Sequence, residues 1–92
     1  MKFYNDFDIE MAARRHQENP ILSRAARVLA EYRDIVNQNS DGWGTWTAGT
    51  KVAGSLVDLL EKHEASETDV RKAVTRVKSF CTRRGLPQPA SA

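Results

Sequence analysis

Apolar residues recur at spacings of three and four between residues 20 and 37, and no other feature constrains the fold of this chain as strongly. The stripe consists of Leu22, Ala25, Leu29, Tyr32 and Val36, and is widened by Ile21, Val28 and Ile35. This spacing places apolar side chains on one face of an α-helix, whereas a half-buried strand alternates every second residue. Asn19 can cap the helix, and Pro20 suits its first position because the missing N–H of proline has no partner there. The sequence therefore predicts a helix over about 20–37.

The last third of the chain contains a helix with clear signals at both ends. Ser66 can act as its N-cap, and Asp69 stands three residues later, as in a variant of the capping box. Gly85 suits the left-handed residue that follows a helix, and Pro87 prevents continuation. The apolar stripe comprises Val70, Ala73, Val74, Val77, Phe80 and Cys81. We expect Cys81 to be a buried thiol that behaves as a small core residue.

Two further helices are predicted from weaker patterns. A first helix is expected over about 5–18, and a third over about 45–63, after a loop at 38–44. If the third helix begins only after Gly49, residues 43–49 all belong to the loop. Sustained period-two alternation is absent from the sequence. The predicted fold class is all-α, a compact bundle of three main helices plus a shorter N-terminal helix.

The length of 92 residues is that of one domain. We expect a single helical domain over 1–86 and a flexible C-terminal tail over 87–92. One cysteine excludes an intramolecular disulfide, and the beginning of the chain lacks the apolar run of a signal peptide. These features favour a reducing, cytoplasmic location, without a membrane-spanning segment.

Positive charge gathers in the predicted last helix. Residues 66–92 contain six bases and two acids and therefore carry +4; because the whole chain carries +2, the other residues carry −2. The six bases are Arg71, Lys72, Arg76, Lys78, Arg83 and Arg84. At 100° per residue, Lys72, Arg76 and Arg83 fall within about 40° of one another, opposite the apolar stripe. Such a face suits phosphates or an acidic protein partner, although a merely solvated face would need no partner.

Two tryptophans three residues apart stand beside glycines, at Trp43 and Trp46. We expect Trp46 in the core. Trp43 is either a lid over one end of the bundle or an exposed anchor for a partner, since tryptophan and arginine dominate interface hot spots. An aromatic ring near bases can also stack on single-stranded nucleic acid.

Residues for catalysis or metal binding are scattered. His16 is expected on the polar side of the first helix, His63 at the end of the third, and Cys81 in the core. This arrangement does not predict a tetrahedral metal site. The sequence has neither a glycine-rich phosphate loop nor a nucleophile elbow. We therefore predict a protein that is not an enzyme and needs neither metal nor cofactor.

The sequence favours a small cytoplasmic adaptor or inhibitor that contacts an acidic protein partner through the basic helix and Trp43. Small accessory proteins of phages and mobile elements share this size, which is an analogy and not a family match. Binding of nucleic-acid phosphates by the same helix is the alternative, and its affinity would fall more steeply with salt.

Two other functions are less favoured. A helix-turn-helix reader of DNA would insert the start of its second helix into the major groove, where this chain has Glu67 and Asp69. A homo-oligomeric structural unit would need an exposed apolar stripe. The first helix has the residues for such a stripe: Phe3, Tyr4, Phe7 and Met11.

Overall fold

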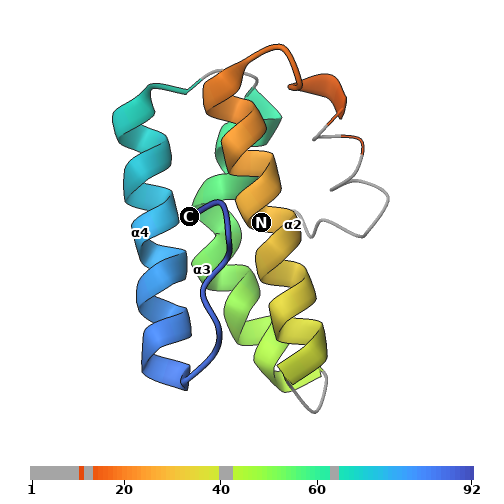
Figure 1. The fold of residues 1–92 in the computed structure, drawn as a ribbon, viewed down its shortest axis with the longest axis vertical. Helices are drawn as coiled ribbons and strands as arrows, with labels where there is room; N and C mark the ends of the chain where they lie inside the picture. The colour runs from red at the N-terminus through yellow and green to blue at the C-terminus, as the bar shows by residue number, and fades with distance from the viewer. Residues whose placement is uncertain (1–10, 12–13, 40–42, 63–64) are drawn as a thin grey trace.

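The computed structural model describes residues 11, 14–39, 43–62 and 65–92, with the side chains of 39 and 43–51 outside the description. Three long helices account for most of the described residues: α2 (Pro20–Asn39), α3 (Trp43–Lys62) and α4 (Glu67–Arg84). Consecutive helices run in opposite directions, so α2 and α4 are parallel to each other and α3 is antiparallel to both (Figure 1). No strand occurs in the described part of the chain, which confirms the all-α prediction for that part.

The boundaries of α2 agree with the sequence prediction within two residues. The Oδ1 atom of Asn19 accepts hydrogen bonds from the backbone N–H groups of Ile21 and Leu22, at 3.1 and 3.2 Å. Asn19 is therefore the predicted N-cap, and Pro20 is the first helical residue. The five residues of the predicted stripe are all buried: Leu22, Ala25, Leu29, Tyr32 and Val36.

Helix α3 begins earlier than the sequence predicted. Gln38 and Asn39 complete α2, and Trp43 and Gly44 already belong to α3, so the predicted loop at 38–44 is too long. The alternative in which 43–49 is all loop is wrong. Glycine lowers helix propensity by about 1 kcal/mol, but propensity alone is a weak guide to where a helix begins.

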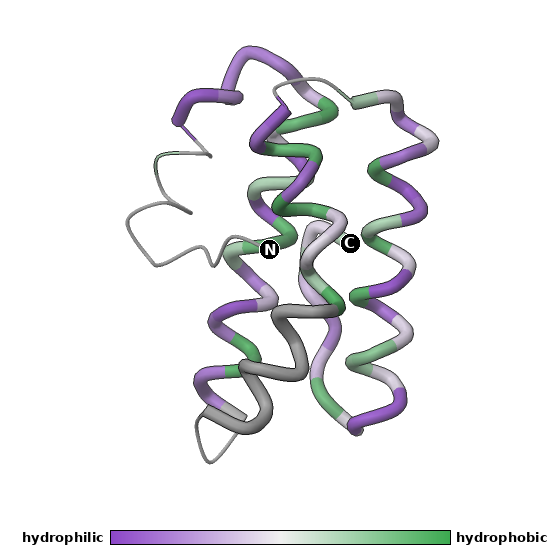
Figure 2. Tube along the Cα trace, turned by 180° about the vertical axis from the view of Figure 1, so that it is seen from behind, coloured by the Kyte–Doolittle hydropathy of each residue, from purple (hydrophilic) through white to green (hydrophobic). Residues whose placement is uncertain are grey.

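Helix α4 has the caps that its sequence predicts. Ser66 Oγ accepts a hydrogen bond from the backbone N–H of Asp69 at 3.1 Å. Gly85 has a φ of 66°, and the N–H groups of Gly85 and Leu86 reach the carbonyl groups of Thr82 and Cys81. This pair of bonds is the Schellman motif. The six apolar residues predicted to form the stripe are all buried. Hydrophobic and hydrophilic residues follow each other with each turn of α4 (Figure 2).

One hydrophobic core joins the three helices. Leu29 of α2, Leu56 and Leu60 of α3, and Val77 and Phe80 of α4 are at most 5% exposed. Phe80 also meets Tyr32 of α2 edge to face, with ring centroids 5.9 Å apart and an interplanar angle of 80°. The helix α4 is thus fixed against both other helices, and its outer face is fixed with it.

The predicted N-terminal helix over 5–18 lies mostly outside the described residues. Met11, Arg14 and Arg15 are helical, and residues 16–18 form a turn. His16 was expected on a polar surface, and that prediction is wrong. Its side chain is only 5% exposed, and its Nε2 atom lies 3.2 Å from the carbonyl oxygen of Leu60. The turn before α2 brings the imidazole ring onto the end of α3, which the periodicity of the first helix does not reveal.

Residues 86–92, which we call the C-terminal segment, turn back along the bundle between α2 and α4 (Figure 1). On the α4 side, Gln88 Nε2 donates hydrogen bonds to the carbonyl oxygen of Lys78 at 3.2 Å and to Thr82 Oγ1 at 2.9 Å. Pro89 is buried.

On the α2 side, one serine connects the C-terminal segment to two charged residues. The backbone N–H and the hydroxyl of Ser91 donate to the two carboxylate oxygens of Glu31, at 2.8 and 2.7 Å. Arg24 Nε donates to the carbonyl oxygen of Ser91 at 3.1 Å. The sequence led us to expect a flexible tail over 87–92. These partners stand sixty or more positions away in the chain, so local patterns do not indicate them. Hydrogen exchange at the Ser91 amide measures whether residues 87–92 are nevertheless flexible.

Candidate functional site

All six bases of α4 have exposed side chains: Arg71, Lys72, Arg76, Lys78, Arg83 and Arg84. Two of them interact within their own helix. Arg71 lies 3.7 Å from the carboxylate of Glu67, and both side chains are about two-thirds exposed or more, so this pair contributes little stability. The guanidinium of Arg84 lies 5.3 Å from the ring centroid of Phe80, in a cation–π contact at the edge of the core.

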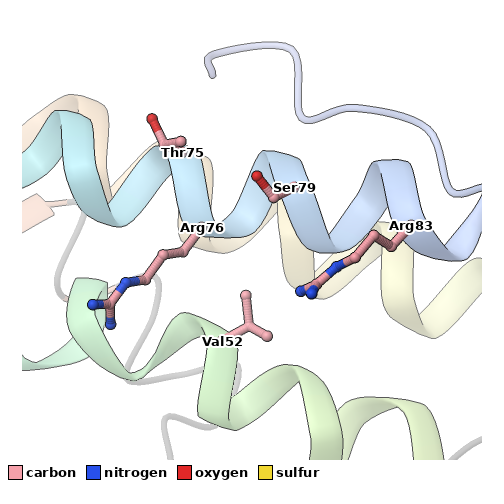
Figure 3. Close-up of a pocket in the computed structure, with 5 residues that line it drawn as sticks. All are labelled: Val52, Thr75, Arg76, Ser79 and Arg83. Atoms are coloured by element: carbon pink, nitrogen blue, oxygen red, sulfur yellow. The ribbon is translucent and has the colours of Figure 1, made fainter.

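Two other arginines, Arg76 and Arg83, line a pocket at the α3–α4 interface, so they lie beside the apolar stripe and not opposite it as the sequence predicted. The pocket has a volume of about 320 Å³ and is lined by Val52 of α3 and by Thr75, Arg76, Ser79 and Arg83 of α4. We call it the α3–α4 groove. Arg76 and Arg83 extend from α4 toward α3 on either side of Val52 (Figure 3). Positions 76, 79 and 83 share one face of a helix because they are separated by three and four residues.

Arg76 is held in place by α3. Its NH1 group donates a hydrogen bond to Ser55 Oγ at 3.1 Å. A guanidinium has five N–H donors, so most of its donors remain open to a ligand. Arg83 has no hydrogen bond or ion pair with the residues that the structure describes.

The described lining of the groove contains no acidic residue, histidine or cysteine. The two guanidinium groups and the Ser79 hydroxyl can donate hydrogen bonds to a ligand, whereas the Thr75 hydroxyl already donates to the carbonyl oxygen of Arg71 at 2.8 Å. Such a set can bind an oxyanion through charge-assisted hydrogen bonds. A carboxylate, an imidazole and a thiol, the usual groups for proton transfer and nucleophilic attack, are not among the described lining residues.

Two buried titratable groups, Tyr32 and Cys81, lie at the other interface of α4, away from this groove. Burial raises the pKa of the Cys81 thiol above its ordinary value of 9.0. Burial also raises the pKa of Tyr32, the nearby Cys81 raises it further, and Arg84 opposes the shift. Cys81 is buried, as the sequence predicted, and a buried thiol with a raised pKa is a poor nucleophile.

The described residues contain no group of three or more histidine, cysteine, aspartate or glutamate side chains placed to hold a metal ion. None of their helices combines the length and apolar character that crossing a membrane requires.

The groove brings together only part of the predicted contact surface. Arg76 and Arg83 line it, whereas Lys72 shares their helical face without lining the pocket. Lys78 lies beside the C-terminal segment, whose Gln88 is bound to its carbonyl oxygen. Trp43 is the first residue of α3, and its side chain lies outside the described residues.

Sequence reasoning missed Val52, Ser55 and Ser79 as parts of the site. Ser79 had a usable signal, because it stands three residues after Arg76 and four before Arg83 on one helical face. Val52 and Ser55 had no signal in the sequence, because their position in the site depends on how α3 packs along α4.

No family model, curated protein or solved structure matches this chain. Its function is therefore inferred from its own residues and their geometry.

Proposed function

We propose that this protein is a small non-enzymatic binding protein, of the adaptor or inhibitor type, that contacts an acidic protein partner through the outer face of α4. One observation carries the proposal. Six bases of α4 are exposed, and two of them share a groove whose described lining has no carboxylate to neutralise them. A surface of this kind attracts an acidic partner and orients it as it approaches.

The overall charge favours a protein partner over a nucleic acid. The chain carries only +2, and the residues outside 66–92 carry −2 together. Binding to a nucleic-acid backbone depends on many bases that neutralise phosphates, and a chain with so small a net charge is less suited to it. The acids Glu67 and Asp69 at the start of α4 also repel phosphates.

Trp43 extends the proposed contact surface at one end. The N-terminus of α3, which Trp43 forms, and the C-terminus of α4, with Arg83 and Arg84, lie at the same end of the bundle (Figure 1). In the proposal Trp43 supplies an aromatic anchor beside these bases, because tryptophan and arginine are the residues most enriched at interface hot spots.

Charge reversal on α4 tests the proposed surface. Lys72→Glu combined with Arg76→Glu changes two exposed positions, and Arg14→Glu with Arg27→Glu makes the same change of charge at exposed positions elsewhere. Each protein is used to capture partners from a lysate of the native cell, with and without nuclease. We expect wild type and the control to retain a protein partner after nuclease treatment, and the α4 variant to lose it.

Circular dichroism should show that all three proteins keep the same helical fold. Equal capture by the folded α4 variant would remove this face from the site. Capture that disappears after nuclease treatment, with affinity that falls steeply with salt, would favour the nucleic-acid alternative. Trp43→Ala should weaken capture of the protein partner without changing the fold.

A further inference from the structure

We propose that the α3–α4 groove is the subsite in which a single carboxylate side chain of the partner is held between Arg76 and Arg83. This inference rests on the proposed function and adds a defined contact to it. The two arginines extend from α4 to either side of Val52, and Ser79 stands between them in the helix (Figure 3). A pocket of about 320 Å³ has room for a side chain.

Ser55 is a positioning residue in this subsite. Its hydroxyl accepts the 3.1 Å hydrogen bond from Arg76, and it belongs to α3, whereas Arg76 belongs to α4. The bond holds a long side chain in one geometry before a ligand arrives, which lowers the entropy lost on binding. The remaining donors of the guanidinium form a planar fork, which matches the two oxygens of a carboxylate.

Among the described residues, the two groove arginines differ from three other arginines in having neither a carboxylate nor an aromatic ring as a partner. Arg71 has the carboxylate of Glu67, Arg33 has that of Asp34 at 2.9 Å, and Arg84 lies over an aromatic ring. The described residues lining the groove provide no acid for Arg76 or Arg83.

Val52 favours a carboxylate that arrives on a side chain. Its isopropyl group lies between the two arginines and is partly buried against the core (Figure 3). The methylene groups of a glutamate can pack on this apolar surface while the carboxylate meets the guanidinium groups. A free phosphate has no apolar part to pack there, so we assign the subsite to a carboxylate side chain.

The test uses the purified protein with a fluorescently labelled peptide of six glutamates, which makes it independent of the natural partner. Arg76→Ala with Arg83→Ala removes the groove charges. Arg71→Ala with Lys78→Ala removes two exposed charges from the outer row of the same helix and is the matched control. We expect the groove variant to bind the peptide about tenfold more weakly or worse, because it loses the charge-assisted hydrogen bonds of two guanidinium groups. The control should lose about threefold or less, as expected for screened surface charges.

Two further variants test the geometry. Arg76→Lys with Arg83→Lys keeps the charge and removes the planar fork, so it should lose most of the affinity. Ser79→Glu places a carboxylate in the groove and should block the peptide, whereas Thr68→Glu adds the same charge elsewhere on α4 and should not. Equal losses in groove variant and control would overturn the subsite, and so would full binding by Ser79→Glu.

Inorganic phosphate distinguishes the two kinds of oxyanion. We expect phosphate to displace the peptide only at concentrations well above those at which free glutarate does so, and the reverse order would overturn the carboxylate assignment. The subsite and the proposed function fail separately. If groove and control variants bind the peptide equally while the charge-reversed α4 variant loses the partner, the function stands and the subsite is wrong. If the groove binds the peptide as expected and charge reversal leaves partner capture intact, the subsite stands and the proposed surface is wrong.

Discussion

Helix α4 packs against two neighbours, and the two interfaces end at the surface in different ways. At the α2–α4 interface the C-terminal segment lies over the junction, and Ser91 is bound by Arg24 and Glu31. At the α3–α4 interface the described residues leave a groove, with Arg76 and Arg83 along it. Both places combine arginine with serine from another part of the chain.

The two interfaces differ in that the α2–α4 interface contains a carboxylate, that of Glu31, and the described lining of the groove contains none. At the α2–α4 interface, Glu31 accepts two hydrogen bonds and Arg24 donates one, so charges and chain groups satisfy one another. In the groove, Arg76 has a neutral hydroxyl partner on Ser55, and the described lining has no acid. An arginine site that the chain completes itself stabilises the fold, whereas one that lacks its anion is available for a ligand.

Leu60→Ala should weaken both interfaces together. Leu60 is fully buried in α3, and its carbonyl oxygen also lies against His16. Truncating a buried leucine lowers the unfolding free energy by about 2–5 kcal/mol. Urea denaturation should show a clear drop in midpoint, and the partly buried Leu59→Ala should cost less. A midpoint like that of wild type would show that the two interfaces do not share this core.

Glu31→Gln should affect the α2–α4 interface alone. The change weakens two hydrogen bonds from Ser91 to a carboxylate, so we expect a loss of about 1–3 kcal/mol in unfolding free energy. Hydrogen exchange at the Ser91 amide should be slow in wild type and faster in the variant. Glu67→Gln, which removes only the exposed pair with Arg71, should change the unfolding free energy by less than about 0.5 kcal/mol.

The exchange rate of Ser91 also tests the flexible tail predicted over 87–92. Unprotected exchange in the wild-type protein would support the flexible tail and remove the C-terminal segment from the contrast. Binding of the glutamate peptide to the groove should be the same in wild type and Glu31→Gln, because Glu31 is not among the described lining residues.

Alkaline pH should destabilise the α2–α4 interface through Cys81. Burial raises the pKa of this thiol in the folded protein above 9.0, so the unfolded chain loses its proton first. Below about pH 9 both states hold the proton and stability is unaffected by this group. Above that pH the unfolding free energy falls as pH rises, by at most about 1.4 kcal/mol per pH unit for one group.

The comparison with Cys81→Ala isolates that contribution. Urea midpoints measured at several pH values between 7 and 10 should fall less steeply for Cys81→Ala than for wild type, whatever the difference at pH 7. Tyr32, whose pKa is raised from 10.0, adds a similar loss at higher pH in both proteins. The native thiol should also resist labelling until denaturant is added. Rapid labelling of the folded protein would place Cys81 at the surface.

The sequence was sufficient for the parts of the fold that local rules control. The caps at Asn19, Ser66 and Gly85 were predicted from single residues and their neighbours, because a cap is formed within one helical turn. The buried stripes of α2 and α4 followed from their periodicity. The beginning of α3 was predicted about two residues too late, because the glycines and turn residues around it favour a loop in the sequence.

The candidate site was only half predictable for the same reason. Arg76 and Arg83 follow from helical spacing, whereas Val52 and Ser55 join them through the packing of α3 along α4. His16 against Leu60, and Ser91 against Glu31, are likewise contacts between residues more than forty positions apart. One sequence without tertiary information does not specify such pairs.

Arg83→Ala should have the smallest effect on stability and still change binding. Its side chain is exposed and has no hydrogen bond or ion pair with the described residues, so the unfolding free energy should change by less than about 0.5 kcal/mol. Arg84→Ala is the adjacent control. It removes the cation–π contact with Phe80 and should cost about 0.5–1 kcal/mol, with little effect on peptide binding. The two neighbours would then show opposite behaviour, one serving a ligand and the other the core. A larger stability loss for Arg83→Ala than for Arg84→Ala would show that the chain itself uses Arg83, and the contrast between the two interfaces would fail.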